Sequence, residues 1–91
     1  MPDSVVSIGE SAFYGCSGLE RITLGKGISI IEKNTFKLCE SLKNITLSSN
    51  VSKICESAFC YCYSLESIII PDSVTDIEFL AFAYCKSLKN V

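Results

Sequence analysis

The sequence predicts a single solenoid domain of the α/β class, built from four stacked units of 23 residues. Three observations favour this fold: apolar residues recur at a fixed 23-residue spacing, each unit contains a short alternating strand pattern, and a length of 91 residues allows one small domain. We expect the units to lie at about 1–18, 19–41, 42–64 and 65–87, followed by a partial strand at 88–91.

The repeat consists of columns of apolar residues that keep their place in every unit. Four columns hold one residue type throughout: Ile8, Ile31, Ile54 and Ile77; Phe13, Phe36, Phe59 and Phe82; Cys16, Cys39, Cys62 and Cys85; and Leu19, Leu42, Leu65 and Leu88. Further columns vary among apolar types, apart from Thr35 in a column of alanines. Because no unit of this size can bury these side chains alone, each unit must pack against the next.

Within a unit, the elements follow in a fixed order. The alternation over 65–70 predicts a short strand with one buried face, and the Pro-Asp-Ser sequence at 71–73 then turns the chain. A second short extended segment is expected at 74–77, and one or two turns of helix or 3₁₀-helix at 56–62. Equivalent strands of successive units are expected to pair in parallel, about 4.8 Å apart.

These residues carry a resemblance to a known family. Residues 65–85, LESIIIPDSVTDIEFLAFAYC, fit the unit L-x-x-I-x-I-P-x-x-V-x-x-I-x-x-x-A-F-x-x-C, which resembles the BspA-like, or Treponema-type, leucine-rich repeat over the whole chain. The resemblance implies an α/β leucine-rich-repeat solenoid that is right-handed, with a parallel β-sheet on its concave side. It also implies adhesion or protein binding, as in bacterial surface proteins and large protist families. The proline is replaced by Gly25 and Ser48 in the middle units.

The composition argues against several classes of function. With 8 Lys and Arg against 10 Asp and Glu, the net charge is −2, so no basic surface for nucleic acid is expected. Histidine is absent, which removes imidazole-based acid–base catalysis. The longest aliphatic run is Ile68–Ile70, so membrane insertion is not expected either. We expect no enzymatic activity and no cofactor, because neither a nucleophile pair nor a phosphate-binding glycine motif is present.

The cysteines have a structural interpretation and two alternatives. Cys16, Cys39, Cys62 and Cys85 share an apolar column, which predicts a stacked ladder of reduced, buried thiols. The first alternative is an inter-unit disulfide, although parallel side chains do not favour one. The second is a zinc site at Cys55, Cys60 and Cys62, but the spacing is not typical of structural zinc, and we expect no metal.

The first candidate binding surface is the concave strand, at the variable positions between the core columns. Its candidate residues are Arg21, Asn44, Thr46, Ser67 and Ile69. Small polar side chains suit hydrogen bonding to a peptide or protein, and Ile69 offers an apolar anchor. The alternative for Ile69 is an ordinary exposed isoleucine.

The second candidate is the column before the cysteine, which contains Leu38, Tyr61 and Tyr84. Leucine and tyrosine gathered on a surface ridge are typical of protein interfaces. The alternative is local packing, in which the tyrosines fold back over their own unit. In the last unit, Phe79 and Leu80 replace polar residues, which indicates an end that a partner covers.

We therefore expect a non-catalytic module that binds a protein partner. The alternative is a structural spacer that stacks end to end, extends a longer array or sits within a larger assembly, which the lack of a polar capping unit favours. No signal peptide is visible in residues 1–20. The chain as given is therefore expected in the cytoplasm, and at the cell surface if it belongs to a longer secreted protein.

Overall fold

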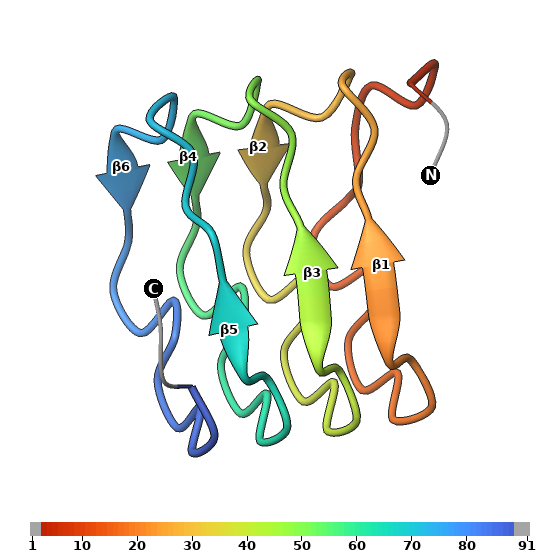
Figure 1. The fold of residues 1–91 in the computed structure, drawn as a ribbon, viewed down its shortest axis with the longest axis vertical. Helices are drawn as coiled ribbons and strands as arrows, with labels where there is room; N and C mark the ends of the chain where they lie inside the picture. Colours follow the sequence, from red (N-terminus) through yellow and green to blue (C-terminus); the bar gives the residue numbers. More distant parts are fainter. Residues whose placement is uncertain (1–2, 89–91) are drawn as a thin grey trace.

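The computed structural model describes residues 3–88, which form a solenoid of two parallel sheets (Figure 1). One sheet has the order β1-β3-β5 and contains Arg21–Thr23, Asn44–Thr46 and Ser67–Ile68. The other has the order β2-β4-β6 and contains Ile30–Ile31, Lys53–Ile54 and Asp76–Ile77. The chain alternates between the two sheets, whose strands run in opposite directions. The predicted solenoid with parallel strands is confirmed.

The strand register follows the repeat in the sequence. Arg21 pairs with Asn44, and Asn44 pairs with Ser67, each 23 residues further along the chain. In the other sheet, Ile31 pairs with Ile54, again at a spacing of 23 residues. Equivalent residues therefore lie directly beside one another, so every variable column of the sequence becomes a row on the surface. The exact unit boundaries stay a prediction.

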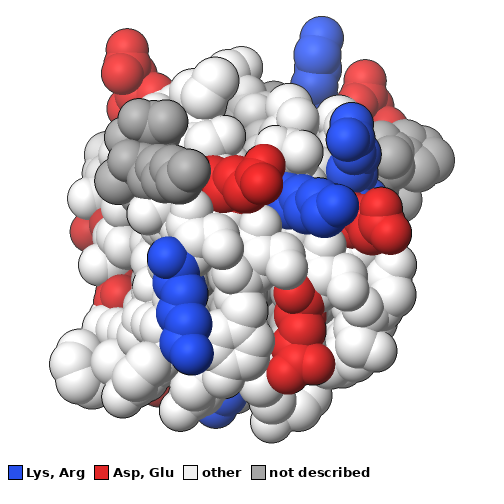
Figure 2. Space-filling model, turned by 60° about the horizontal axis from the view of Figure 1, so that its bottom comes forward, with Lys and Arg blue, Asp and Glu red and all other residues white. Residues whose placement is uncertain are grey.

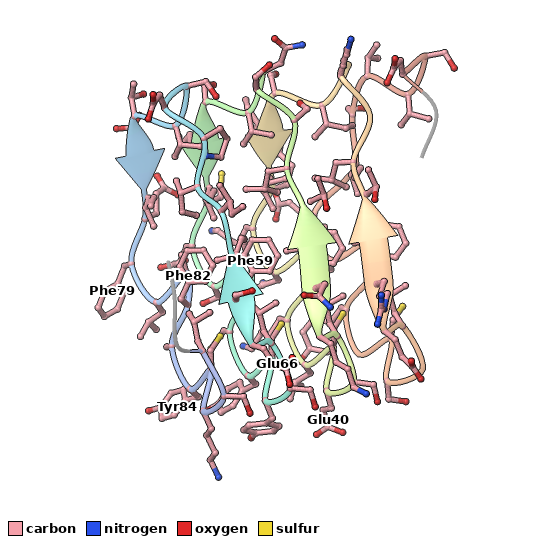
Figure 3. All side chains as sticks on the ribbon, viewed as in Figure 1. Glu40, Phe59, Glu66, Phe79, Phe82 and Tyr84 are labelled. Atoms are coloured by element: carbon pink, nitrogen blue, oxygen red, sulfur yellow. The ribbon has the colours of Figure 1, made fainter. Side chains whose placement is uncertain are left out.

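The core lies between the two sheets and follows the predicted columns. The four phenylalanine rings form one stack, with centroids 5.3, 5.2 and 5.2 Å apart and interplanar angles of 1° to 4°. Phe36 and Phe59 are fully buried in the middle of this stack, and Figure 3 shows Phe59 and Phe82 between the sheets. Leu42 and Leu65 are also fully buried beside the rings. Offset parallel rings at this separation combine apolar burial with favourable ring geometry.

The predicted helical turn at 56–62 is wrong, and no helix occurs anywhere in residues 3–88. Ser57 and Tyr61 adopt left-handed backbone conformations, with φ of 58° and 63°, which interrupt any right-handed turn. Alternate N–H groups then donate to a different unit. Tyr61 donates to the carbonyl of Ala83 in the next unit at 2.9 Å, whereas Cys60 donates within the segment to the carbonyl of Ser57 at 3.2 Å. A helix of this length is marginal alone, and the inter-unit bonds replace it.

Burial decreases toward the outer units. Ile77, predicted to belong to the core, is 51% exposed, because β6 is the outermost described strand of its sheet. A core side chain in a solenoid needs a neighbouring unit on each side, and Ile77 has one. Of the predicted partial strand at 88–91, Leu88 is not in a strand, and residues 89–91 lie outside the described part.

The cysteine column forms a ladder of free thiols. The Sγ atoms of Cys39 and Cys62 each donate to a phenylalanine carbonyl of the preceding unit, Phe13 and Phe36, at 3.1 Å. Burial raises the pKa of the Cys39 thiol to about 11 and raises the pKa of Cys62 further. The protonated thiol is therefore the stable form, and it links successive units.

Candidate interaction surfaces

The outward face of the β1-β3-β5 sheet carries the first set of predicted residues. Strand alternation points Arg21, Asn44 and Ser67 outward in one row, and Thr46 outward in the next row. Arg21 and Thr46 are exposed, whereas Asn44 and Ser67 are half-buried. The sheet therefore presents small hydrogen-bonding groups at regular spacing, with the arginine at one side.

A hollow of about 280 Å³ lies on this face between β3 and β5. Four of the five predicted residues line it, together with parts of the strands and of the following turn: Asn44, Thr46, Ser67 and Ile69, with Ile45, Leu47, Ile68 and Pro71. Ile69 is 85% exposed, and Arg21 lies outside the lining on β1. Since ligand pockets usually begin at about 300 Å³, this hollow suits one inserted side chain better than a whole small molecule.

The second predicted surface lies on the turns that join one sheet to the other. Leu38, Tyr61 and Tyr84 all adopt left-handed backbone conformations, with φ of 62°, 63° and 61°. The rings of Tyr61 and Tyr84 stack with centroids 4.7 Å apart and an interplanar angle of 6°. Tyr84 is 60% exposed at the outer edge of these turns (Figure 3). The local packing considered for these tyrosines does occur, both between neighbouring units, as for Tyr61 and Tyr84, and within one unit, as for Tyr61 and Tyr63.

Three further residues join these tyrosines and were not identified from the sequence. Tyr63 contacts Tyr61 edge-on, with centroids 5.9 Å apart and planes at 63°. The Nζ atom of Lys86 lies 5.2 Å from the Tyr63 ring centroid, and that of Lys37 lies 6.0 Å from the Tyr61 centroid. Such distances allow cation–π attraction. The sequence feature that could have identified Tyr63 and Lys86 is their shared column with Glu40. This column lies two residues after the column of Leu38, Tyr61 and Tyr84.

The predicted apolar end of the last described unit is exposed. Phe79 is 73% exposed and Leu80 is 41% exposed. Leu80 has a φ of 62°, the conformation that Ser57 has one unit earlier. Figure 3 shows Phe79 at the outer side of this unit, where it lines a shallow hollow of about 450 Å³ with Lys33, Glu56 and Glu78.

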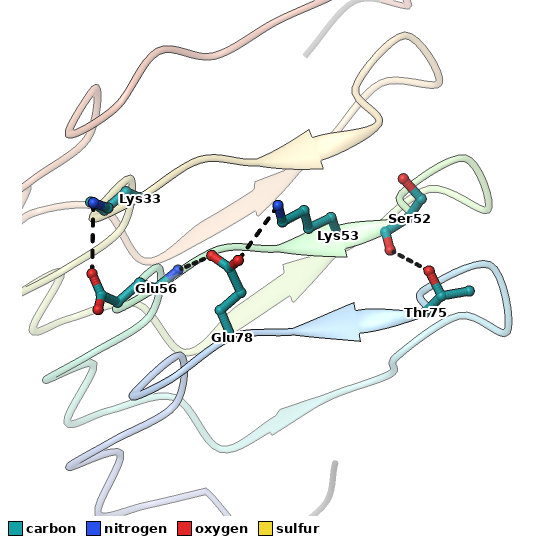
Figure 4. Close-up of polar contacts among 6 residues, drawn as sticks. All are labelled: Lys33, Ser52, Lys53, Glu56, Thr75 and Glu78. Carbon is teal, nitrogen blue, oxygen red and sulfur yellow. Dashed lines mark hydrogen bonds and ion pairs between the residues drawn. The ribbon is translucent and has the colours of Figure 1, made fainter.

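A polar ladder connects units on the side of the β2-β4-β6 sheet (Figure 4). Glu78 accepts the backbone N–H of Glu56 at 3.1 Å and pairs with Lys53 at 3.5 Å, while Lys33 pairs with Glu56 at 3.7 Å. The nearby carboxylate of Glu78 raises the pKa of Lys53. These groups are solvated, so the ladder orients neighbouring units more than it stabilises them.

The described residues present no group of three or more His, Cys, Asp and Glu side chains that could hold a metal ion. Within residues 3–88, no helix is long and apolar enough to cross a membrane. Charged side chains are scattered among uncharged ones on the face seen in Figure 2.

A solenoid of parallel strands with 23-residue units and exposed variable rows defines a leucine-rich-repeat protein. Residues 1–91 match the family described as the BspA type leucine rich repeat region (6 copies), and the chain belongs to this family. The family resemblance inferred from the sequence is therefore confirmed. Proteins of this kind are generally interaction or surface modules.

Solved structures of related proteins have the same fold. A leucine rich cell surface protein from Faecalibacterium prausnitzii is 43% identical with a TM-score of 0.95, and the match covers 99% of this chain and 24% of that one. A leucine-rich repeat protein from Bacteroides ovatus is 41% identical with a TM-score of 0.94, over 100% and 24% of the two chains. A T. pallidum leucine rich repeat protein is 29% identical with a TM-score of 0.78, over 92% and 50%.

The chain thus spans about a quarter of the length of the first two relatives. A comparison with curated protein sequences finds no significant match.

Proposed function

We propose that this chain is a non-catalytic protein-interaction module that binds its partner through the outward face of the β1-β3-β5 sheet, with the tyrosine edge as a second contact. The observation that carries the proposal is the hollow between β3 and β5, where Asn44, Thr46, Ser67 and Ile69 come together. These four residues are called the sheet hollow below.

The chemistry of the sheet hollow fits a protein ligand. Ile69 extends an apolar side chain that is 85% exposed, and Asn44, Thr46 and Ser67 surround it with donors and acceptors. Protein interfaces combine an apolar anchor with a hydrogen-bonding rim in this way. The hollow of about 280 Å³ accepts one apolar side chain of a partner.

The proposed location is the cell surface, because the Faecalibacterium relative is described as a cell surface protein. A surface module that displays a row of small polar residues is suited to adhesion.

Site-specific cross-linking tests the proposal. A photoreactive p-benzoylphenylalanine replaces Ser67 in the sheet hollow and, as the matched control, Thr75 beside the other sheet. The partner cross-linked in source-cell extract is identified by mass spectrometry and then purified in its free form, and its Kd is measured against the unmodified chain, Ile69→Arg and Thr75→Arg. We expect cross-linking from position 67 and a loss of at least tenfold in affinity for Ile69→Arg alone. Equal behaviour of the two positions would contradict the proposal.

A second candidate function, a structural spacer, is favoured by the apolar end at Phe79 and Leu80. In the preceding unit, the N–H of Ser57 donates to the carbonyl of Phe79 at 3.2 Å, and Leu80 repeats the backbone conformation of Ser57. The same geometry suits the addition of another unit of this repeat. Sedimentation velocity over a concentration series tests the end-to-end form of the spacer function. This form predicts self-association that Phe79→Glu abolishes, whereas a monomer at all concentrations excludes end-to-end stacking.

A further inference from the structure

The cluster of Lys37, Tyr61, Tyr63, Tyr84 and Lys86 is called the tyrosine–lysine patch. We propose that this patch binds the carboxylates of an acidic segment in the partner protein, held in the polyproline II conformation. The inference deepens the proposed function and rests on it in one respect, namely that the partner is a protein.

The three tyrosine rings of the patch contact one another. Tyr84 covers one face of Tyr61 at 4.7 Å with nearly parallel planes, and Tyr63 packs edge-on against Tyr61 at 5.9 Å. Tyr61 and Tyr63 are nevertheless only half-buried, and Tyr84 is exposed. Since the Tyr61 ring is packed against its neighbours, the ring most open to a ligand is that of Tyr84, which is 60% exposed.

The backbone beneath the patch is costly for tyrosine. Tyr61 and Tyr84 occupy left-handed positions, where Gly15 in the first unit adopts a φ of 70° without steric penalty. The positive φ belongs to the turn of every unit, since Leu38 adopts it at the equivalent position. The tyrosine stack is therefore placed on a backbone conformation that favours glycine.

The lysines of the patch supply positive charge that no described acidic group neutralises directly. The ion pairs within residues 3–88 join Lys33 to Glu56 and Lys53 to Glu78 (Figure 4). Lys37 and Lys86 instead lie over tyrosine rings. Glu40 lies on the same edge as Tyr84 in Figure 3 and opposes an anionic ligand in part.

Donor groups thus dominate the patch, and they select an acceptor-rich ligand. Lysine ammonium groups donate only, and tyrosine hydroxyls donate to carboxylates in short, charge-assisted hydrogen bonds. The exposed ring of Tyr84 also offers an aromatic surface, on which proline-rich segments dock in the polyproline II conformation. A proline-containing acidic segment satisfies both features.

The spacing of the lysines sets the spacing of the carboxylates. Lys37 belongs to one unit and Lys86 to the second unit after it, so their backbones are about 10 Å apart along the solenoid at the strand spacing. In polyproline II, residues three apart lie on the same face and are separated by about 9 Å. A ligand with Glu or Asp at every third residue matches this separation along the solenoid, and we propose that spacing.

The test uses the full chain and two synthetic peptides, (Glu-Pro-Pro)₄ and (Gln-Pro-Pro)₄. Binding is followed by amide chemical-shift changes and by calorimetry at low salt. We expect (Glu-Pro-Pro)₄ to shift residues 37–40, 61–63 and 84–86, and (Gln-Pro-Pro)₄ to leave them unchanged. A single-stranded oligonucleotide of equal charge serves as a further probe. Equal binding of that oligonucleotide or of (Gln-Pro-Pro)₄ would overturn the proposal, as would no binding of (Glu-Pro-Pro)₄.

Matched variants locate the charge effect. Lys37→Gln with Lys86→Gln should weaken (Glu-Pro-Pro)₄ binding at least tenfold, and Glu40→Gln should strengthen it at least twofold. The control pair, Lys26→Gln with Lys33→Gln, changes the net charge equally but lies outside the patch and should change affinity less than twofold. An equal loss in the control pair would reduce the effect to general charge and overturn the proposal.

A variant without a charge change tests the role of the tyrosine hydroxyl groups. Tyr61→Phe with Tyr63→Phe keeps the ring contacts and removes two hydroxyls, and it should weaken binding about threefold while the circular dichroism spectrum is unchanged. An unchanged affinity would overturn the role of the hydroxyls. If the peptide fails to bind but Ile69→Arg still abolishes binding of the purified partner, this inference fails and the proposed function stands.

Discussion

The rings of Phe36 and Phe59 stack 5.2 Å apart with planes only 4° from parallel, although the two residues belong to successive units. Both side chains are fully buried, so the contact is made entirely in the core. The 23-residue spacing that is visible in the sequence therefore corresponds to a physical contact between side chains.

The phenylalanine stack should dominate stability. Phe59→Ala removes a fully buried ring with neighbours on both sides and should lower the free energy of unfolding by about 3–5 kcal/mol. Phe13→Ala should cost less, because Phe13 is only partly buried and stacks on one side. Urea unfolding followed by circular dichroism measures both variants, and equal losses would contradict the role of stacking neighbours.

The left-handed positions predict an unusual response to substitution. Leu38 has a φ of 62°, which costs an L-residue about 1–2 kcal/mol relative to glycine. Leu38→Gly should therefore leave stability nearly unchanged despite the lost side chain, whereas β-branched Leu38→Val should destabilise the fold. At Lys37, where φ is not positive, Lys37→Gly should instead cost about 0.5–1 kcal/mol. A larger loss of unfolding free energy for Leu38→Gly than for Leu38→Val would contradict the left-handed conformation of Leu38.

Thr35 is the polar exception in the apolar columns, and the structure explains it. Its side chain is fully buried, and its Oγ1 donates to the carbonyl of Glu32 at 2.8 Å. Thr35→Val preserves the shape and removes this bond, so the free energy of unfolding should fall by about 1 kcal/mol. Ala58→Val in the next unit adds volume without removing a bond and is the control for steric effects. Increased stability of Thr35→Val would contradict this role.

The buried thiols predict a decrease in stability at alkaline pH. The pKa of Cys39 rises from 9.0 to about 11 in the folded chain, so the unfolded chain loses this proton first as the pH increases. The stabilising contribution is complete below pH 9 and is lost between about pH 9 and 11, with a slope of up to about 1.4 kcal/mol per pH unit for each thiol. The free energy of unfolding measured from pH 8 to 11 should fall less steeply in Cys39→Ala than in the unmodified chain. Identical slopes of the unfolding free energy against pH in the two chains would show that Cys39 does not contribute to the alkaline loss of stability.

Periodicity in the sequence was sufficient to predict the strands and the core of the inner units, but not the turns or the exposure of Ile77 in the outermost described strand. The columns of phenylalanine and cysteine become stacks because inter-unit packing repeats whatever the sequence repeats. The turn at 56–62 was misassigned because its hydrogen bonds go to the next unit, as from Tyr61 to Ala83, and no propensity within one unit reveals that. Gly15 and Asn34, both at positive φ, were the available signals for left-handed positions.

The candidate surfaces were predicted in part for the same reason. Asn44, Ser67 and Ile69 lie together because the parallel register aligns variable columns, which the repeat alone implies. Lys37 and Tyr63 were missed, since their approach to Tyr61 depends on side-chain direction in turns whose backbone conformation was not predicted.

The central claim, that the β1-β3-β5 face binds a protein, is tested most directly by hydrogen–deuterium exchange of the full chain with and without the free partner that cross-linking identifies. We predict that binding slows amide exchange at 44–47 and 67–71 and leaves 53–54 and 75–77 unchanged. Protection confined to the β2-β4-β6 sheet, or no protection on either face, would contradict the claim.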